Sequence, residues 1–288
     1  MAVLGDKQAW QVENSCKGVD ELVHWMQELQ PELIVVEATG GYQRSVVDGL
    51  FHAELAVAVV NPARVRQFAR ASGLLAKTDK LDAQVLAEFG RKMQPKQYEG
   101  KSEAEKQLSA LLVRRKQLEE MLKAEQNRLR TIAPSLRGSM ERIIAFLKDE
   151  KKRLEEQVEE FLKEQKAWQE QAQILSSAPG DGMVTTATLL ADLPELGKMD
   201  RKKTLAPHAS AGVAALVGVA PMNYDSGKMR GYRKTKGGRT DVRSVLYMST
   251  LVATRYNPVI QAQYQQLLKR GKLKKVALTA CMRKFLTI

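Results

Sequence analysis

The sequence predicts an α/β domain followed by mainly helical sequence. Three observations support this prediction. Short apolar runs alternate with helical patterns up to about residue 98, charged leucine-rich sequence follows over residues 99–173, and helical runs around one polar loop fill residues 174–288. Alternating strand and helix patterns are typical of α/β domains. A chain of 288 residues is long enough for two or three domains.

The N-terminal domain, residues 1–98, shows apolar runs of strand length and amphipathic runs of helix length. The run at residues 55–60 suits a buried strand, and Pro62 favours the first position of a helix. The elements expected are, in order, a β-hairpin (2–4 and 8–12), a helix (19–29), a strand (33–36), a helix (42–51), a strand (56–60), a helix from Pro62 and a helix near residue 79.

The middle segment, residues 99–173, has apolar residues at heptad a and d positions on both sides of Pro134. Arg115, Glu125 and Lys151 interrupt the pattern. Such a repeat predicts either a helical hairpin within one chain or a coiled coil that joins two copies, and the narrow apolar stripe favours the coiled coil. The residues of the repeat are Leu108, Leu111, Leu118, Leu122, Leu129, Ile132, Met140, Ile144, Leu147, Leu154, Val158 and Phe161.

The C-terminal segment, residues 174–288, begins with a glycine-containing turn at residues 177–182. This turn predicts a helix-hairpin-helix, in which backbone N–H groups approach a phosphate, or an ordinary connector between two helices. An apolar helix at 213–217, a polar loop at 218–238 and three further helical runs follow.

The net charge of +13 indicates a polyanionic partner, most often nucleic acid. An anionic membrane is the alternative, but no apolar run approaches the ~18 residues of a membrane span. Cys16 and Cys281 lie far apart in the sequence and without metal-ligand spacing, so we expect both to be reduced packing residues.

Three carboxylates form a candidate metal site. Glu37 ends an apolar strand, and Asp79 and Asp82 lie one turn apart at the start of a helix. Mg²⁺ takes oxygen ligands, usually a few carboxylates with water and substrate phosphate. Each acid also has a structural interpretation: Glu37 as a helix-capping or salt-bridged residue, and the aspartates as an N-cap or first-turn helix acids. Basic residues expected to contact nucleic acid nearby are Arg64, Arg66, Arg70 and Lys77.

The polar loop contains a candidate nucleophile, Ser226. From Ser226 to Arg239 there are six lysines or arginines and no acid. This composition predicts a loop that contacts phosphates. Ser226 either belongs to that contact surface or attacks a phosphate whose charge the basic residues stabilise. The basic residues assigned to nucleic-acid binding are Lys228, Arg230, Arg233, Lys234 and Lys236.

Several motifs in order resemble the DEDD transposases of the "one-ten" insertion-sequence group, which are bridge-RNA-guided DNA recombinases. The resemblance covers nearly the whole chain. Its motifs are residues 37–42 (Glu-Ala-Thr-Gly-Gly-Tyr), 61–66 (Asn-Pro-Ala-Arg-Val-Arg), 76–83 (Ala-Lys-Thr-Asp-Lys-Leu-Asp-Ala), Ala220-Pro221 with 226–231 (Ser-Gly-Lys-Met-Arg-Gly), 252–258 and 274–284.

The resemblance implies a RuvC-like domain of ribonuclease-H type, a coiled coil, and a C-terminal domain with a nucleophilic serine. Glu37, Asp79 and Asp82 match the second, third and fourth acids of the family's Mg²⁺ site, and Ser226 matches the serine that becomes linked to DNA. The family further implies a structured guide RNA, DNA ends and target as substrates, and a homo-oligomer (a dimer assembling to a tetramer) in which acids and serine meet across protomers. It also implies a prokaryotic, cytoplasmic, nucleoid-associated protein.

The chain departs from the family pattern in three places. The family's first Asp lies on a strand that precedes the opening residues Met1–Leu4, the C-terminus falls within a helical run, and residues 203–212 look like extra sequence. We therefore expect nucleic-acid binding with poor recombination by this chain. Two alternative functions remain open: a RuvC-like structure-selective nuclease that uses a metal-activated water, and a non-catalytic nucleic-acid-binding remnant.

Overall fold

The computed structural model describes residues 10–74, 78–198 and 212–287. The chain forms two compact units, Met1–Lys101 and Ser102–Ile288. The first unit corresponds closely to the predicted domain 1–98. The predicted segments 99–173 and 174–288 both lie in the second unit.

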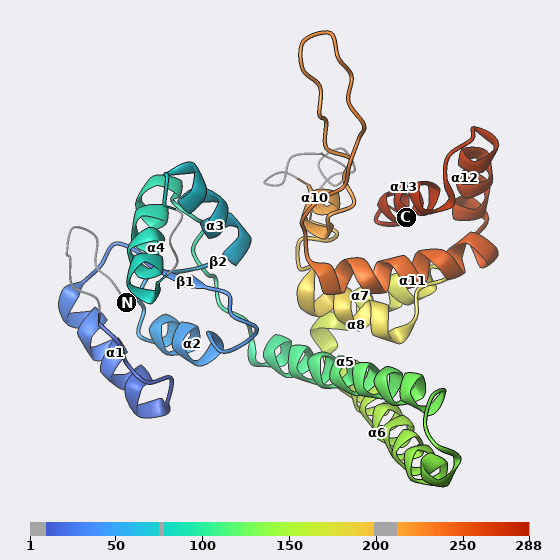
Figure 1. The fold of residues 1–288 in the computed structure, drawn as a ribbon, viewed down its shortest axis with the longest axis horizontal. Coiled ribbons are helices and arrows are strands. Elements are labelled where there is room, and N and C mark those ends of the chain that lie inside the picture. Colours follow the sequence, from blue (N-terminus) through green and yellow to red (C-terminus); the bar gives the residue numbers. More distant parts are fainter. Residues whose placement is uncertain (1–9, 75–77, 199–211, 288) are drawn as a thin grey trace. The chain divides into compact units, whose positions relative to one another are not determined.

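The first unit is an α/β fold built on two parallel strands (Figure 1). The helices and strands predicted between residues 19 and 93 are confirmed. Of the predicted N-terminal hairpin, residues 2–4, 8 and 9 lie outside the described residues, and residues 10–12 form no strand. The elements are α1 (Cys16–Leu29), β1 (Ile34–Glu37), α2 (Arg44–His52), β2 (Val57–Val60), α3 (Pro62–Ala71) and α4 (Asp79–Met93).

Side-chain alternation along β1 gives this unit two hydrophobic cores. Ile34 and Val36 pack with α1 and α2, whereas Val35 packs with α3 and α4. Because successive strand residues point to opposite faces, Glu37 lies on the face of Val35, which α4 covers. Gly90 of α4 permits this close packing, since a Cβ there would lie 2.7 Å from Val35 Cγ2.

Local sequence signals set the helix starts of the first unit. Ser15, Asn61 and Thr78 are the N-cap residues of α1, α3 and α4, and each side chain accepts a hydrogen bond from a backbone N–H of the first turn. Pro62 occupies the first position of α3, as predicted.

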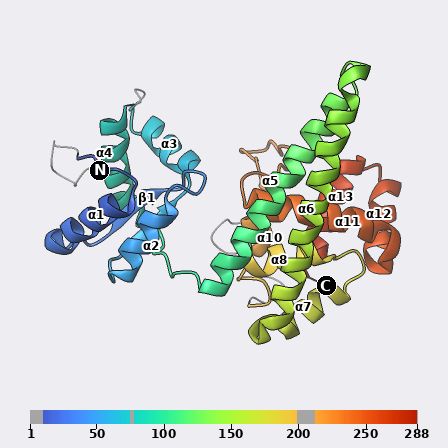
Figure 2. The same cartoon turned by 90° about the horizontal axis from the view of Figure 1, so that it is seen from below.

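The second unit begins with the hairpin of α5 (Glu103–Leu129) and α6 (Arg137–Glu164), joined through the short helix η1 (Pro134–Leu136) (Figure 2). Of the predicted heptad residues, Leu118, Leu122, Ile144 and Leu147 form one buried cluster between the two helices. The hairpin within one chain is thus confirmed. Joining of two copies through it stays a prediction.

Two of the charged residues that interrupt the heptads, Arg115 and Lys151, form ion pairs across this hairpin. Arg115 Nη2 lies 2.7 Å from Glu155 Oε1, and Lys151 Nζ lies 2.7 Å from Glu119 Oε2. The ion pair with Lys151 lowers the pKa of Glu119. The third interruption, Glu125, pairs with Arg128 of its own helix.

The remaining helices pack onto the hairpin and onto one another. Leu108 of α5, Val158 of α6 and Ala187 of α8 share one core, so the predicted segments on both sides of residue 174 are packed together. A second core joins α8, α10, α11 and α13. These elements are α7 (Lys166–Ser177), α8 (Met183–Asp192), α10 (Val213–Val217), α11 (Thr240–Tyr256), α12 (Pro258–Lys269) and α13 (Lys274–Phe285).

The two cysteines differ in environment. Cys281 is fully buried, as predicted, and burial raises the pKa of its thiol to about 11. Cys16 is exposed at the start of α1, so the prediction that it is a packing residue was wrong, because it occupies the solvent side of the first helical turn. Within the described residues, no helix combines the length and the apolar character that crossing a membrane requires.

Candidate active site

The three predicted acids line one cavity in the first unit. Glu37 ends β1, and Asp79 and Asp82 lie in the first turn of α4, whose N-terminus is fixed by the hydrogen bond from Leu81 N to Thr78 Oγ1 (3.3 Å). All three acids lie along the wall of a cavity of about 1380 Å³. The fold thus brings together residues that are more than 40 positions apart in the sequence.

The three acids are too far apart to bind one ion together. Among the described residues, no three carboxylate, histidine or cysteine side chains are close enough to hold one ion together. Glu37 and Asp82 are half-buried and Asp79 is exposed. The donor chemistry suits Mg²⁺, which commonly takes one or two carboxylates and completes its coordination with water and substrate phosphate.

The predicted basic residues of the first unit differ in their surroundings. The Arg64 guanidinium lies 5.8 Å from the ring centroid of Phe89, a cation–π arrangement. Arg66 is half-buried and Arg70 is exposed in the last turn of α3. Lys77 lies outside the described residues, as does most of the predicted extra segment 203–212.

Residues 218–238 of the second unit form an extended hairpin between α10 and α11, hereafter the serine hairpin (Figure 1). Ser226 lies at its tip, where the chain turns. Met222 pairs with Lys234 in antiparallel fashion, and Ser226 pairs with Met229 through two backbone hydrogen bonds of 3.0 and 2.9 Å. Gly227, with φ +54°, makes the turn possible. The side chain of Ser226 is exposed.

Asp225, next to Ser226, holds the two arms of the serine hairpin together. Its Oδ1 accepts hydrogen bonds from Arg233 Nη1 (2.6 Å) and from the backbone N–H of Gly231 (3.1 Å). The hydrogen bond from Arg233 keeps the pKa of Asp225 below its ordinary value and raises that of Arg233. Arg233, predicted to bind nucleic acid, is thus paired within the hairpin.

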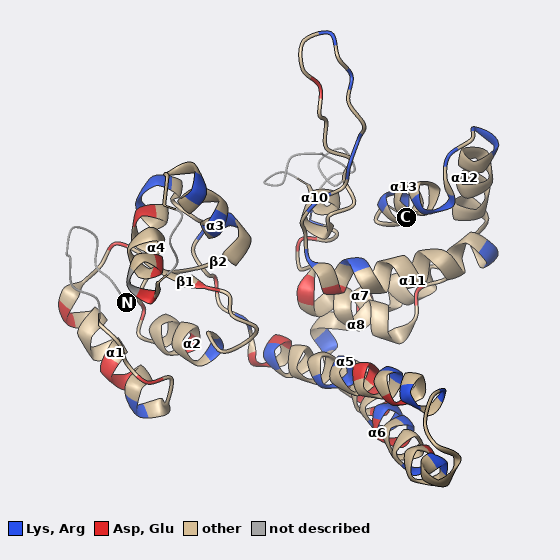
Figure 3. Cartoon of the chain, in the orientation of Figure 1, with Lys and Arg blue, Asp and Glu red and all other residues tan. Residues whose placement is uncertain are grey.

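Further basic residues lie along the serine hairpin and at its base (Figure 3). Arg239, at its base, forms a bidentate ion pair with Glu195, with distances of 2.6 and 2.7 Å, and therefore fixes the loop to the helical body. The predicted nucleic-acid ligands Lys228, Arg230, Lys234 and Lys236 are exposed. Tyr224 and Tyr232, which the sequence analysis did not assign, are also exposed, at 50% and 89%.

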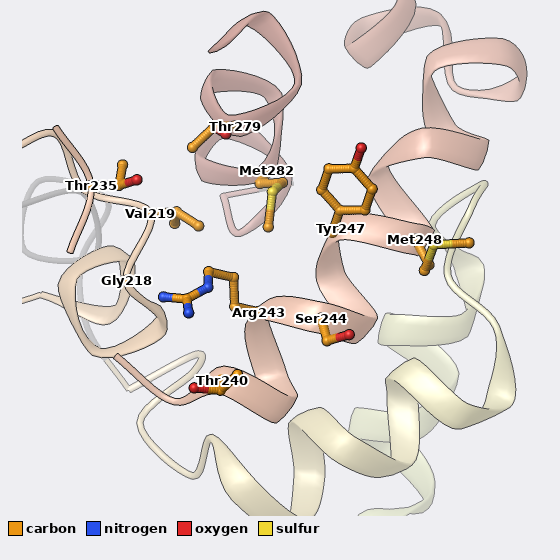
Figure 4. A pocket seen from close by; sticks show the side chains of 10 residues that line it. All are labelled: Gly218, Val219, Thr235, Thr240, Arg243, Ser244, Tyr247, Met248, Thr279 and Met282. Carbon is orange, nitrogen blue, oxygen red and sulfur yellow. The ribbon is translucent and has the colours of Figure 1, made fainter. Parts of the chain in front are cut away.

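A pocket of about 300 Å³ lies at the base of the serine hairpin, between the hairpin ends, α11 and α13 (Figure 4). The guanidinium of Arg243 hydrogen-bonds the carbonyl oxygen of Gly237 and so anchors one hairpin arm to α11. The residues around the pocket are Gly218, Val219, Thr235, Thr240, Arg243, Ser244, Tyr247, Met248, Thr279 and Met282.

The predicted helix-hairpin-helix turn joins α7 to α8 and contains a half-buried acid, Asp181. Ser249 of α11 and Thr186 of α8 each donate a 3.4 Å hydrogen bond to the carboxylate of Asp181. Thr185 Oγ1 lies 2.6 Å from Ser249 Oγ. Burial raises the pKa of Asp181 to about 7. The turn is therefore fixed to α11 by a small polar cluster.

Two protein-family profiles match this chain. Residues 4–136 match the transposase domain of the DEDD IS110 type, and residues 172–265 match the domain described as "Transposase IS116/IS110/IS902 family". The chain carries IS110-family transposase domains. The first of them contains Glu37, Asp79 and Asp82 and implies a ribonuclease-H-like fold, and the second contains Ser226.

Two similar proteins extend this result to almost the full chain. The "Pilin gene-inverting protein" of Moraxella bovis is 29% identical over 283 residues, which span 96% of this chain and 85% of that protein. The protein of the same name from Moraxella lacunata shows the same identity and coverage. The transposase domains and these relatives indicate DNA transposition or recombination.

Proposed function

We propose that this chain cuts and rejoins DNA through a covalent bond between Ser226 and a DNA strand. The observation that carries the proposal is the position of Ser226 at the exposed tip of a basic hairpin within a transposase domain. An exposed tip gives a serine access to a phosphate of double-helical DNA. The nearby Lys228 and Arg230 would stabilise negative charge that develops on that phosphate.

The proposed chemistry is a pair of transesterifications. In the first, Ser226 Oγ loses its proton and bonds to the scissile phosphorus, while the bond from phosphorus to one deoxyribose oxygen breaks and that oxygen takes up a proton. In the second, a deoxyribose hydroxyl of the strand to be joined attacks the same phosphorus and releases the serine. One phosphodiester is exchanged for another, so no external energy source is needed.

The proposed role of Glu37, Asp79 and Asp82 is to hold Mg²⁺. Their carboxylate oxygens suit this ion, and the shared cavity leaves space for water and a DNA phosphate beside them. Bound Mg²⁺ would neutralise charge on that phosphate and lower the barrier to its attack. Half-buried Glu37 and Asp82 would orient the ion, with exposed Asp79 nearer to solvent.

Covalent trapping tests the serine step. The full chain is incubated with Mg²⁺ and a plasmid that carries this gene with its flanking DNA, and nuclease-digested adducts are mapped by mass spectrometry. We expect a nucleotide remnant on Ser226, no adduct with Ser226→Ala, and normal adduct formation with the control Ser139→Ala, an exposed serine of α6. Cleavage that survives Ser226→Ala would instead identify a nuclease that uses activated water. Binding without cleavage would identify a non-catalytic protein.

We further propose that a structured RNA and a second copy of the chain complete the active assembly. The net charge of +13 suits RNA as well as DNA, and the acids lie in the first unit whereas the serine lies in the second. Purification without nuclease should yield RNA bound to the chain. Mass measurements before and after ribonuclease treatment would separate RNA-dependent from RNA-independent oligomers, and a monomer without RNA in both samples would contradict this part.

A further inference from the structure

The serine hairpin exposes two tyrosines beside the candidate nucleophile. Tyr232 is 89% exposed and Tyr224 is 50% exposed. Burial of an exposed ring against a partner is favourable, so these side chains can contribute to binding. Tyr256 of α11, 69% exposed, is an aromatic side chain of the same unit that lies outside the hairpin.

The pairing of the hairpin places both tyrosines close to Ser226. Met222 pairs with Lys234 and Ser226 pairs with Met229, so Tyr224 and Tyr232 lie in facing arms between these two pairs. Residues two apart in an extended arm point to the same face, which puts Tyr224 and Ser226 on one face about 7 Å apart along the strand. The arm that carries Tyr232 packs directly against the arm that carries Tyr224, since a Cβ on Gly231 would lie 2.1 Å from the Tyr224 oxygen.

An ion pair joins the two arms of the hairpin beside the tyrosines. Asp225 follows Tyr224, Arg233 follows Tyr232, and the two charged side chains meet at 2.6 Å. These two charges are therefore held within the hairpin, whereas the tyrosine rings, Ser226 and the remaining cations are exposed.

The charge around the tyrosines favours nucleic acid over protein as the partner. The stretch from Ser226 to Arg239 has six basic residues and no acid. Aromatic side chains next to cations bind single strands by stacking under bases while the cations contact the phosphates. Exchange of DNA strands requires unpaired bases next to the cut, so such a platform matches the reaction.

We infer that Tyr224 and Tyr232 form a stacking platform for unpaired bases of the DNA strand beside the phosphate that Ser226 attacks. This inference rests on the proposed function for the identity of the strand. The platform itself requires only that the hairpin bind unpaired DNA. Stacking on Tyr232 stabilises the opened strand and keeps it from re-pairing while Ser226 reacts.

The test compares binding of the full chain to two DNA probes of the same sequence, a duplex and a duplex with a central bubble that contains 2-aminopurine. We expect Tyr232→Ala to bind the bubble roughly tenfold or more weakly, to keep its affinity for the duplex, and to lose the 2-aminopurine fluorescence change. Tyr232→Phe, which retains the ring, should bind like the unchanged protein. The control Tyr256→Ala should have no effect.

Several results would overturn the inference. One is unchanged bubble binding by Tyr232→Ala; another is an equal loss on bubble and duplex, which would show a general effect on the hairpin. A change in oligomer mass on Tyr232→Ala would assign the tyrosines to contacts between copies. Failure of the proposed function would look different. If Tyr232→Ala weakens binding to the bubble only, but no adduct forms on Ser226, the stacking platform is supported and the nucleophilic role of Ser226 is rejected.

Discussion

Asp181 shows how one half-buried residue can make the stability of this chain depend on pH. Its carboxylate lies in the α7–α8 turn and accepts hydrogen bonds from hydroxyl groups, among them those of Thr186 and Ser249. Burial opposes the charged form, and the pKa rises from 3.8 to about 7. Between these two pH values the folded chain holds a proton that the unfolded chain has released. The free energy of unfolding therefore falls as pH rises from about 4 to about 7.

Asp181→Asn should remove this pH dependence. The amide stays neutral and can still hydrogen-bond to the hydroxyl groups, so we expect its stability advantage over Asp to grow by about 1–3 kcal/mol between about pH 5 and pH 8. Denaturant unfolding at the two pH values measures this growth. Asp20→Asn, on the exposed face of α1, is the control. An equal difference between Asp181→Asn and the unchanged protein at both pH values would refute the argument.

At the scale of elements, the α5–α6 hairpin combines apolar heptads with internal ion pairs. Arg115 and Glu155 have side chains that are only 19% and 29% exposed, whereas the side chains of Lys152 and Glu156 on α6 are 75% and 63% exposed. Ion pairs gain strength as water is excluded, and exposed pairs contribute little. The Arg115–Glu155 pair should therefore contribute to the pairing of the two helices.

Double-mutant cycles to alanine measure that contribution. We expect a coupling free energy of about 1 kcal/mol for Arg115 with Glu155, and below about 0.5 kcal/mol for the exposed control pair Lys152 with Glu156. Thermal or urea unfolding of the four variants of each cycle provides the values. Equal coupling in the two cycles would mean that the pairing across the hairpin adds no stability.

The base of the serine hairpin depends on two adjacent glycines in different ways. Gly237 and Gly238 both have positive φ, at 72° and 83°. A Cβ on Gly238 would lie 2.3 Å from the Gly218 backbone nitrogen, whereas a Cβ on Gly237 would have nothing within 4 Å. A side chain at either position would therefore strain the backbone. Only a side chain at position 238 would also collide with the other arm of the hairpin.

The matched substitutions separate these effects. Gly237→Ala should lower the free energy of unfolding by about 1 kcal/mol through strain alone. Gly238→Ala should cost at least about 2 kcal/mol more, because the two hairpin arms must also separate. Thermal unfolding measures both, and DNA binding reports whether the hairpin still presents Ser226. Similar losses at both positions would show that the arms can part freely.

Across the whole molecule, local sequence signals predicted helices and strands better than they predicted which residues contact each other. Pro62 and the two aspartates predicted where α3 and α4 begin, because helix starts depend on neighbouring residues, although the N-cap of α4 is Thr78 and not Asp79. Heptads predicted that α5 and α6 pair, but not that Arg115 meets Glu155 40 residues away. Likewise, composition predicted that Arg233 binds a phosphate. Composition does not reveal that Asp225 already forms an ion pair with this side chain.

For the candidate site too, the sequence predicted the residues but not their distances. Glu37, Asp79 and Asp82 were predicted together and line one cavity, because strand ends and helix starts meet in α/β folds. Their spacing depends on long-range packing such as Gly90 against Val35, which no local pattern encodes. Tyr224 and Tyr232 became candidates only through their exposure beside Ser226, which the sequence does not encode locally.

The basic excess of the molecule predicts how DNA binding responds to salt. Arg233 and Arg239 pair with Asp225 and Glu195, so the exposed Lys228, Arg230, Lys234 and Lys236 are the hairpin cations available for phosphates. Each phosphate contact contributes about one unit to the slope of log affinity against log salt concentration.

The double variant Lys234→Gln/Lys236→Gln should therefore reduce the slope by about two units, with folding stability unchanged. Lys152→Gln/Lys163→Gln removes two lysines from α6 that pair with Glu156 and Glu159, and should leave the slope as it is. Arg239→Gln should instead lower the melting temperature, because it leaves Glu195 without its bidentate partner. Equal salt slopes for the two double variants would show that DNA binding depends on the total charge of the molecule and not on contacts with the serine hairpin.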